Sequence, residues 1–414
     1  MFWRNRLKTV VPGLLSQDDK VRGKAFTKLS EIAERGLSEA EAAYAIRAAA
    51  LKFIPSEFEW QDANAQLIHA VAQSFHSEII PEIRRIFAKY PASAQAASLH
   101  LLGNVELPEA TEALVDLLAQ LAEDVPINLE NLAEEPRHAE ILFPRILNHV
   151  QRIRLRWPIS KVILAHLSKG WKPTRALTLE IANKMIQIHN DIKQILFQRQ
   201  QSTGTNWIWE DEYQEYRSLD ALVLDVLGRL DNPALMAEFI EVLQSHDPRL
   251  KMFAVLGLIR NGVDPERYQI VSVAESAESR NWFYRHLAEL GRLELFPESF
   301  ATQEAFAEGD MVNWLIFPTE LARAPDEIEL MATIPMTVPQ GLSDYFVFRF
   351  RTFEPHWAAK KGWLAGVSGP FLWGERPSVK AGGDTFSSFT PWNECPPEEH
   401  LRRTLELLQK AANK

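Results

Sequence analysis

Amphipathic helical periodicity dominates the chain from Asp18 to about Arg292. Apolar residues recur every three to four positions in stretches of about 12–20 residues, which short Pro, Gly, Asn and Asp segments separate. The pattern predicts helices over Val21–Ala33, Ala40–Leu51, Ala63–Phe75, Ile79–Tyr90, Ala92–Leu102, Glu109–Leu121, Ile141–Trp157, Ile159–Leu167, Arg175–Arg199, Leu219–Leu230, Ala234–Gln244 and Arg249–Arg260. Because the connections are short, we expect neighbouring helices to pack antiparallel, as a globular bundle or as a helical solenoid.

The pattern changes near the C-terminus, where Gly and Trp become frequent and residues alternate between apolar and polar. Strands are predicted at 328–334, 345–351, 363–368 and 385–389, followed by an amphipathic helix that begins at Pro397. We therefore expect a mainly α chain with a small α+β module at its end. The expected domains are a helical region at 1–292, an ordered, partly helical connector at 293–335 and the Trp/Gly-rich module at 336–414.

One helix pair shows a repeat-like signature. Asp247-Pro248 is typical of a helix start and Gly262 of a helix end. Two segments share an order of acidic, apolar, basic and small side chains. One copy is Asp18, Val21, Arg22 and Ala25, and the other is Asp247, Leu250, Lys251 and Ala254. A looser third copy is Tyr90-Pro91 with Ala97 and Leu102.

This order resembles the HEAT-repeat family of armadillo-like α-solenoids, in which a small residue stands where paired helices pack closely. The resemblance implies a HEAT-like α-α superhelix over 1–292. The run Phe348–Phe371 is also similar to bacterial HEAT-repeat proteins, which implies no activity. An irregular all-α bundle is the alternative fold.

Charge is segregated along the chain. The net charge is −10, from 45 Lys+Arg and 55 Asp+Glu, which disfavours general binding to polyanions. Residues 106–140 contain ten acidic residues and one basic residue, whereas residues 145–175 contain eight basic residues and no acid. On one helix, Arg145, His149, Arg152 and Arg156 would share a stripe, with Trp157 and Trp171 as stacking groups.

Together with Lys161, Lys172 and Arg175, this stripe is a candidate site for an anion or an acidic partner. The alternative is internal: the basic stripe pairs with the acidic segment before it. A second candidate contact is the segment 200–216, interpreted as a loop that presents Trp207, Trp209, Tyr213 and Tyr216 to a partner. Alternatively, Trp207 and Trp209 fold back to cover a helix pair.

Catalytic motifs are largely missing from the sequence. It contains no Walker loop, no HExxH and no paired CxxC, and Gly366-Val-Ser-Gly369 lacks the spacing of a nucleophile elbow. Nothing brings His356, Cys395 and His400 together. We therefore expect no catalytic residue, metal or cofactor and lean against an enzyme. A single cysteine and no apolar run of about 18 residues indicate a cytoplasmic protein without membrane contact.

These features favour a non-enzymatic scaffold or adaptor that binds another protein on a curved solenoid surface. The acidic charge suggests an immunity-type protein that neutralises a basic toxin. The alternative is a nucleic-acid-binding or DNA-repair protein that resembles HEAT-like alkylpurine glycosylases and uses the stripe at 145–175. A third hypothesis, a phycobilin-lyase-like enzyme, rests on fold analogy alone. The C-terminal module is expected to cap the repeat stack, or else to hold a ligand among Trp357, Trp363, Trp373 and Trp392.

Overall fold

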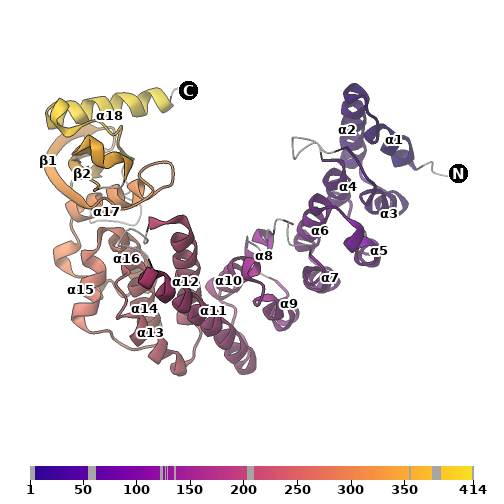
Figure 1. Ribbon diagram of the computed structural model, residues 1–414, viewed down its shortest axis with the longest axis horizontal. Coiled ribbons are helices and arrows are strands. Elements are labelled where there is room, and N and C mark those ends of the chain that lie inside the picture. Colours follow the sequence, from indigo (N-terminus) through magenta and orange to yellow (C-terminus); the bar gives the residue numbers. More distant parts are fainter. Residues whose placement is uncertain are drawn as a thin grey trace. The chain divides into compact units, whose positions relative to one another are not determined.

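The computed structural model describes residues 5–54, 62–121, 125, 127, 129–134, 137–202, 209–353, 356–374 and 384–412. They form two compact units, Met1–Asn190 and Asp191–Lys414. The chain is mainly helical and carries a four-stranded antiparallel sheet near its C-terminus, which confirms the coarse fold class (Figure 1). The division at residue 190 falls inside the expected 1–292 region, and the domain boundaries at 292 and 335 remain predictions.

The helices of the first unit are α1 (Val11–Leu14), α2 (Asp19–Glu34), α3 (Glu39–Ala48), α4 (Ala63–Ala72), α5 (Ile79–Ile86), α6 (Ala92–Asn104), α7 (Pro108–Leu118), α8 (Glu130–Glu134), α9 (Ala139–Ile146), α10 (Ile153–Ser168) and the start of α11 (Arg175–Ser202). Most of them begin close to their predicted starts, whereas α1 and α8 were not predicted and α10 begins six residues before the predicted start at Ile159. Side-chain caps explain several starts: Asp18 accepts from the backbone N–H groups of Lys20 and Val21, and Ser38 and Glu41 form a capping box.

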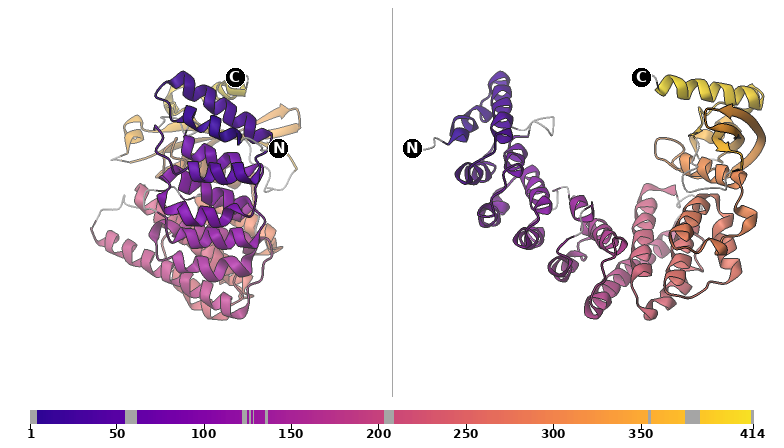
Figure 2. Two further views of the ribbon diagram at one scale, coloured as in Figure 1. Left: turned by 90° about the vertical axis from the view of Figure 1, so that its right-hand side faces the viewer. Right: turned by 180° about the vertical axis from the view of Figure 1, so that it is seen from behind.

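Two rows of helices make up most of this unit (Figure 2). In one row α2 packs on α4, α4 on α6, α6 on α8 and α8 on α10; in the other α3 packs on α5, α5 on α7 and α7 on α9. Contacts of α3 with α4 and of α6 with α7 join the rows. Fully buried apolar side chains such as Leu67, Ile83 and Leu114 fill the space between them.

The predicted single helix over Ile141–Trp157 is wrong. Helix α9 ends at Ile146, a 3-10 turn (η4, Leu147–His149) follows, and Arg152 adopts an extended conformation before α10 begins. The Arg152 guanidinium donates to the carbonyl oxygens of Leu118 and Leu121, at 2.6 and 2.8 Å. This contact with the end of α7 accounts for the turn, and periodicity alone gives no sign of it.

The second unit contains the remaining helices. They are α12 (Asp211–Arg229), α13 (Met236–Val242), α14 (Pro248–Arg260), α15 (Arg267–Glu275), α16 (Ala277–Glu289), α17 (Gln303–Leu315) and α18 (Pro397–Ala412). The predicted start of α14 is confirmed, because Asp247 accepts from the backbone N–H groups of Arg249 and Leu250. Gly262, with φ +76°, follows its end, as the glycine pattern predicts.

Helices α12 and α14 cross at a contact between glycines. A Cβ atom built on Gly228 would lie 2.9 Å from the Cα of Gly257, and one built on Gly257 would lie 2.6 Å from the Phe239 ring. Glycine is therefore required at both positions, because a side chain at 228 would push α12 away from α14 and one at 257 would collide with the Phe239 ring of α13.

The sheet has the order β1-β2-β3-β4, with β1 (Glu327–Val338), β2 (Gly341–Arg351), β3 (Leu364–Leu372) and β4 (Asp384–Phe386). The predicted strands and the predicted final helix are present within a few residues. Strands β1 and β2 pair from Glu327–Arg351 to Val338–Gly341, with a bulge between Leu330 and Ala332. Because β1 extends to Val338, the expected boundary at 335 falls inside a strand.

Both faces of the sheet are covered. On one face Tyr345, Val347 and Val367 pack with Leu401 of α18. On the other, Gly366 allows Met311 of α17 to approach β3, beside the buried ring of Phe350. The Phe346, Phe348 and Phe350 face therefore meets α17, not the last helix. Among the described residues, no helix has the length and apolar character that crossing a membrane requires.

Candidate functional site

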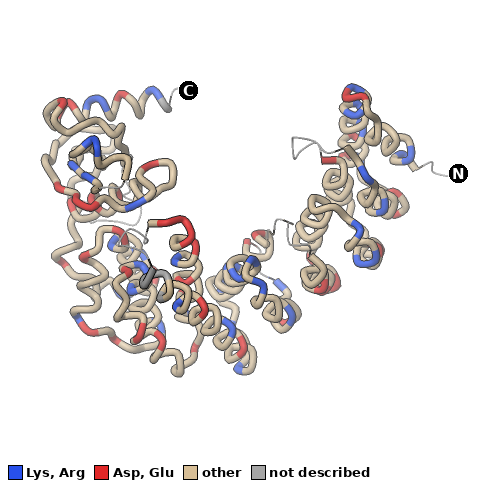
Figure 3. Tube along the Cα trace, viewed as in Figure 1, with Lys and Arg blue, Asp and Glu red and all other residues tan. Residues whose placement is uncertain are grey.

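The acidic and basic segments of the first unit pair with each other at several points. Helix α7 carries Glu112 and Asp116, between basic positions on α5 and α9 (Figure 3). Arg145 of α9 forms ion pairs with both carboxylates at 3.5 Å, and Arg84 of α5 pairs with Asp116 at 3.1 Å. Arg145 is thus a partner of α7, as the internal-pairing alternative predicts.

Three arginines at the start of α10 donate to backbone carbonyl groups. Besides the contacts of Arg152, Arg154 donates to the carbonyls of Val125 and Leu121, at 3.2 and 3.3 Å. Arg156 is buried and donates to the carbonyl of Val150. Cations at the C-terminal end of a helix satisfy its last carbonyls and complement its dipole. Arg152 and Arg154 therefore complete the fold around the end of α7, and Arg156 does so at Val150, directly after η4.

The other members of the predicted basic stripe lie apart. His149 is half-buried, and burial is the main cause that lowers its pKa. Lys161 pairs with Glu130 at 3.1 Å. Lys172 and Arg175 are exposed before and at the start of α11. The structure therefore does not bring the seven residues together as one continuous surface.

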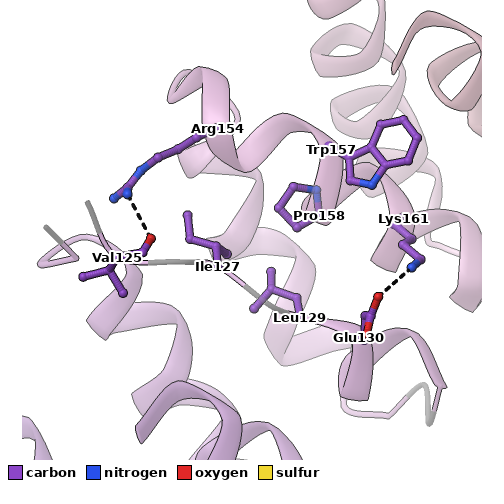
Figure 4. A pocket seen from close by; sticks show the side chains of 8 residues that line it. All are labelled: Val125, Ile127, Leu129, Glu130, Arg154, Trp157, Pro158 and Lys161. Carbon is purple, nitrogen blue, oxygen red and sulfur yellow. Dashed lines mark hydrogen bonds and ion pairs between the residues drawn. The ribbon is translucent and has the colours of Figure 1, made fainter. Parts of the chain in front are cut away.

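A groove of about 470 Å³ lies between α10 and the segment that leads into α8 (Figure 4). Its lining is Val125, Ile127, Leu129, Glu130, Arg154, Trp157, Pro158 and Lys161. Figure 4 shows Arg154 directed to Val125 and Lys161 to Glu130, with Ile127, Leu129 and Pro158 between them. Charged groups thus hold its two ends, while its middle is apolar.

Large apolar side chains stand exposed beside this groove. Ile153 and Trp157 are one helical turn apart on the same face of α10, and they are 71% and 44% exposed. An exposed tryptophan next to an apolar groove is typical of a protein-binding surface. From the sequence, Trp157 is predicted as a stacking group beside an anion site, and nothing in the sequence indicates an apolar groove next to it.

The segment 200–216, predicted as an aromatic loop, is helical at both of its described ends, since α11 extends to Ser202 and α12 begins at Asp211. Trp207 lies outside the described residues. Tyr213 and Tyr216 lie in α12, whose start at Asp211 contradicts the loop interpretation; Asp211 and Glu212 favour a helix N-terminus there. Tyr213 is buried, Tyr216 is half-buried, and Trp209 faces the guanidinium groups of Arg217 and Arg323.

A buried ionic network in the second unit was not predicted. Arg217 donates to both carboxylate oxygens of Asp247, at 2.5 and 2.9 Å, and pairs with Glu278 at 2.6 Å. The Tyr213 hydroxyl donates to Asp247 at 2.9 Å. Burial, then Asp247, raises the pKa of Tyr213, and Arg217 keeps the pKa of Asp247 low in spite of burial. Sequence pattern indicates Asp247 as a cap but gives no sign of a partner 30 residues away.

The weak catalytic candidates have structural partners. Ser368 is buried in β3 and shares a hydrogen bond with Thr385 at 2.9 Å. The His356 ring contacts the carbonyl of Leu321, and the His400 ring contacts the carbonyl of Trp392. Over the described residues, His, Cys, Asp and Glu side chains form no group of three that could hold a metal ion.

In comparisons with known proteins, no family model matches the chain, and no curated protein or solved structure is detectably similar to it.

Proposed function

We propose that this protein is a non-enzymatic scaffold that binds another protein through the groove along α10. The observation that carries the proposal is the pairing of an apolar groove with the exposed side chains of Ile153 and Trp157, while the cations around it are engaged within the fold. Tryptophan and its apolar neighbours commonly dominate the binding energy of protein interfaces.

A HEAT-type solenoid is the architecture that we propose for the helical rows. Contacts between helices two positions apart, in two parallel rows, are what stacked helical pairs require. The aspartate caps at Asp18 and Asp247 serve equivalent roles at the starts of α2 and α14, which supports the repeat. In this proposal the C-terminal sheet covers the end of the helical stack within the second unit, where it packs on α17.

The nucleic-acid alternative has less support. A phosphate-binding surface needs guanidinium and ammonium groups that can exchange their partners for phosphates. Arg152, Arg154 and Arg156 are bound to main-chain carbonyls, and Arg145 and Lys161 pair with carboxylates. The net charge of −10 fits a basic protein partner better, in line with the immunity-type hypothesis.

The groove is tested by site-specific photocrosslinking in a lysate of the source organism. A photoreactive amino acid at position 153 should yield one recurrent crosslinked protein. Trp157→Ala should weaken the binding of this chain to that protein, once purified, about 30-fold. The control carries the same group at Glu31, an exposed position on α2. Equal crosslinking at both positions, or binding unchanged by Trp157→Ala, would contradict the proposal.

A further inference from the structure

A second cavity, of about 440 Å³, lies in the second unit. Helices α14 and α16 and the residues after α17 form it, and the lining includes Arg249, Phe253, Glu278, Trp282 and Phe317. It shares no lining residue with the groove on α10. The two are therefore separate sites.

The buried ionic network lies at the inner side of this cavity. Glu278 lines the cavity and is held by Arg217, which in turn binds Asp247 through two hydrogen bonds. The side chains of Arg217 and Asp247 are only 2% and 6% exposed. The network fixes the inner wall of the cavity. Its one guanidinium faces two carboxylates, so it keeps one negative charge, which the neighbouring Arg249 guanidinium balances.

Arg249 is the cation of the cavity that remains available. Among the described residues, its guanidinium takes part in no hydrogen bond or ion pair, although the residue is only partly exposed. Burial, and then the neighbouring charge of Arg217, lowers the pKa of Arg249. A partly desolvated guanidinium with unfilled donors is a strong site for a carboxylate, which it can bind with two parallel hydrogen bonds.

Aromatic side chains form the rim. Trp282 is 47% exposed and Phe317 is 60% exposed. The Trp282 indole is fixed by its hydrogen bond to Asn313 and by the Arg285 guanidinium over its ring, at 4.8 Å from the centroid. A rim of fixed, exposed aromatic groups offers contact area at little cost in conformational entropy.

We infer that this cavity binds a peptide segment of a partner protein in which a carboxylate pairs with Arg249 and an adjacent apolar side chain packs between Trp282 and Phe317. The unfilled hydrogen-bond donors of Arg249 select the carboxylate, and the exposed rim selects the apolar neighbour. A peptide fits better than a small carboxylate, because a small molecule on Arg249 would leave most of the rim in water. The inference is independent of the groove on α10.

The test is a selection of random displayed peptides on the immobilised full-length chain. We expect the selected peptides to share an Asp or Glu next to an aromatic or aliphatic residue. Arg249→Met should weaken their binding about 30-fold, the usual scale for a charge-assisted hydrogen-bonded pair. Lys251→Met, two positions along α14 and outside the lining, is the matched control and should leave binding unchanged.

A change in the peptide tests the pairing without altering the protein. When its acidic residue is replaced by the corresponding amide, the peptide should lose about 30-fold in affinity for the wild-type chain. Its affinity for the Arg249→Met chain should not fall further. Trp157→Ala should have no effect, which separates this site from the groove on α10. Each of three results would overturn the inference. They are selected peptides without an acidic residue, an equal loss of affinity in both chains on the amide replacement, and indole-3-acetate that binds as tightly as the peptides.

Discussion

Asp310 of α17 illustrates how burial shifts the pKa of a single residue. Its carboxylate accepts a hydrogen bond from Asn281 at 2.7 Å. Burial raises its pKa to about 6, and that effect outweighs the hydrogen bond and the charge of Arg285, which lower the pKa. The folded protein therefore binds a proton more tightly than the unfolded chain, whose Asp pKa is about 3.9.

This raised pKa predicts a pH-dependent stability. Between about pH 4 and pH 6 the folded state holds more protons, so the free energy of unfolding falls as the pH rises and stays lower at pH 7. Asp310→Asn keeps an oxygen for Asn281 and removes the charge. We expect it to raise the free energy of unfolding by about 2 kcal/mol at pH 7 and by almost nothing at pH 4, measured by urea titration.

The matched control is Asp231→Asn, an exposed position in the same unit. It should change stability by less than about 0.5 kcal/mol at either pH. A loss of stability for Asp310→Asn at pH 7, or an equal gain at both pH values, would show that burial of the charge is not the cause.

Where two helices pack closely, a single glycine can decide how near they approach each other. Gly228 lies where α12 meets α14, whereas Gly23 lies inside α2, where an added methyl group would have nothing within 4 Å. Both glycines are helical, so the intrinsic preference for alanine is similar at the two positions. The surroundings of each glycine should therefore decide whether alanine raises or lowers the free energy of unfolding.

Glycine-to-alanine substitutions test this difference. Gly228→Ala places a methyl group against the backbone of Gly257, so it should lower the free energy of unfolding by about 1–3 kcal/mol. Gly23→Ala should raise it by about 0.5–1 kcal/mol, because alanine is the better helix former. Thermal and urea unfolding of both variants measure the two changes. The same sign for both would contradict the close approach of α12 and α14.

Over the whole molecule, the net charge of −10 and the internal pairing of Arg145 and Lys161 predict weak interaction with DNA. At about 50 mM salt, where phosphate contacts are strong, the chain should not shift a random duplex at micromolar protein concentration. Electrophoretic mobility at several salt concentrations is the measurement. A shift that weakens steeply with salt, and that Lys172→Glu with Arg175→Glu abolishes, would instead favour the nucleic-acid alternative.

Most elements were predictable because their signals are local. Apolar periodicity and the aspartate caps at Asp18 and Asp247 locate α2 and α14 within a few residues, and alternation locates β1 and β2. The break between α9 and α10 was not predictable, since it depends on hydrogen bonds from Arg152 to the end of α7. The start of α12 was hidden because its first turns are rich in aromatic and acidic residues.

The order of residues along the chain was enough to establish a mainly helical protein with a C-terminal sheet and a separation of acidic from basic segments. Periodicity, capping residues and charge order are local properties, so the sequence alone shows them. Which charges are available for a partner depends instead on the folded chain. The fold binds Arg152 and Arg156 to backbone carbonyls, joins Arg217 to Asp247, leaves Trp157 exposed and places Arg249 in the lining of a cavity, because burial and pairing depend on residues distant in the chain.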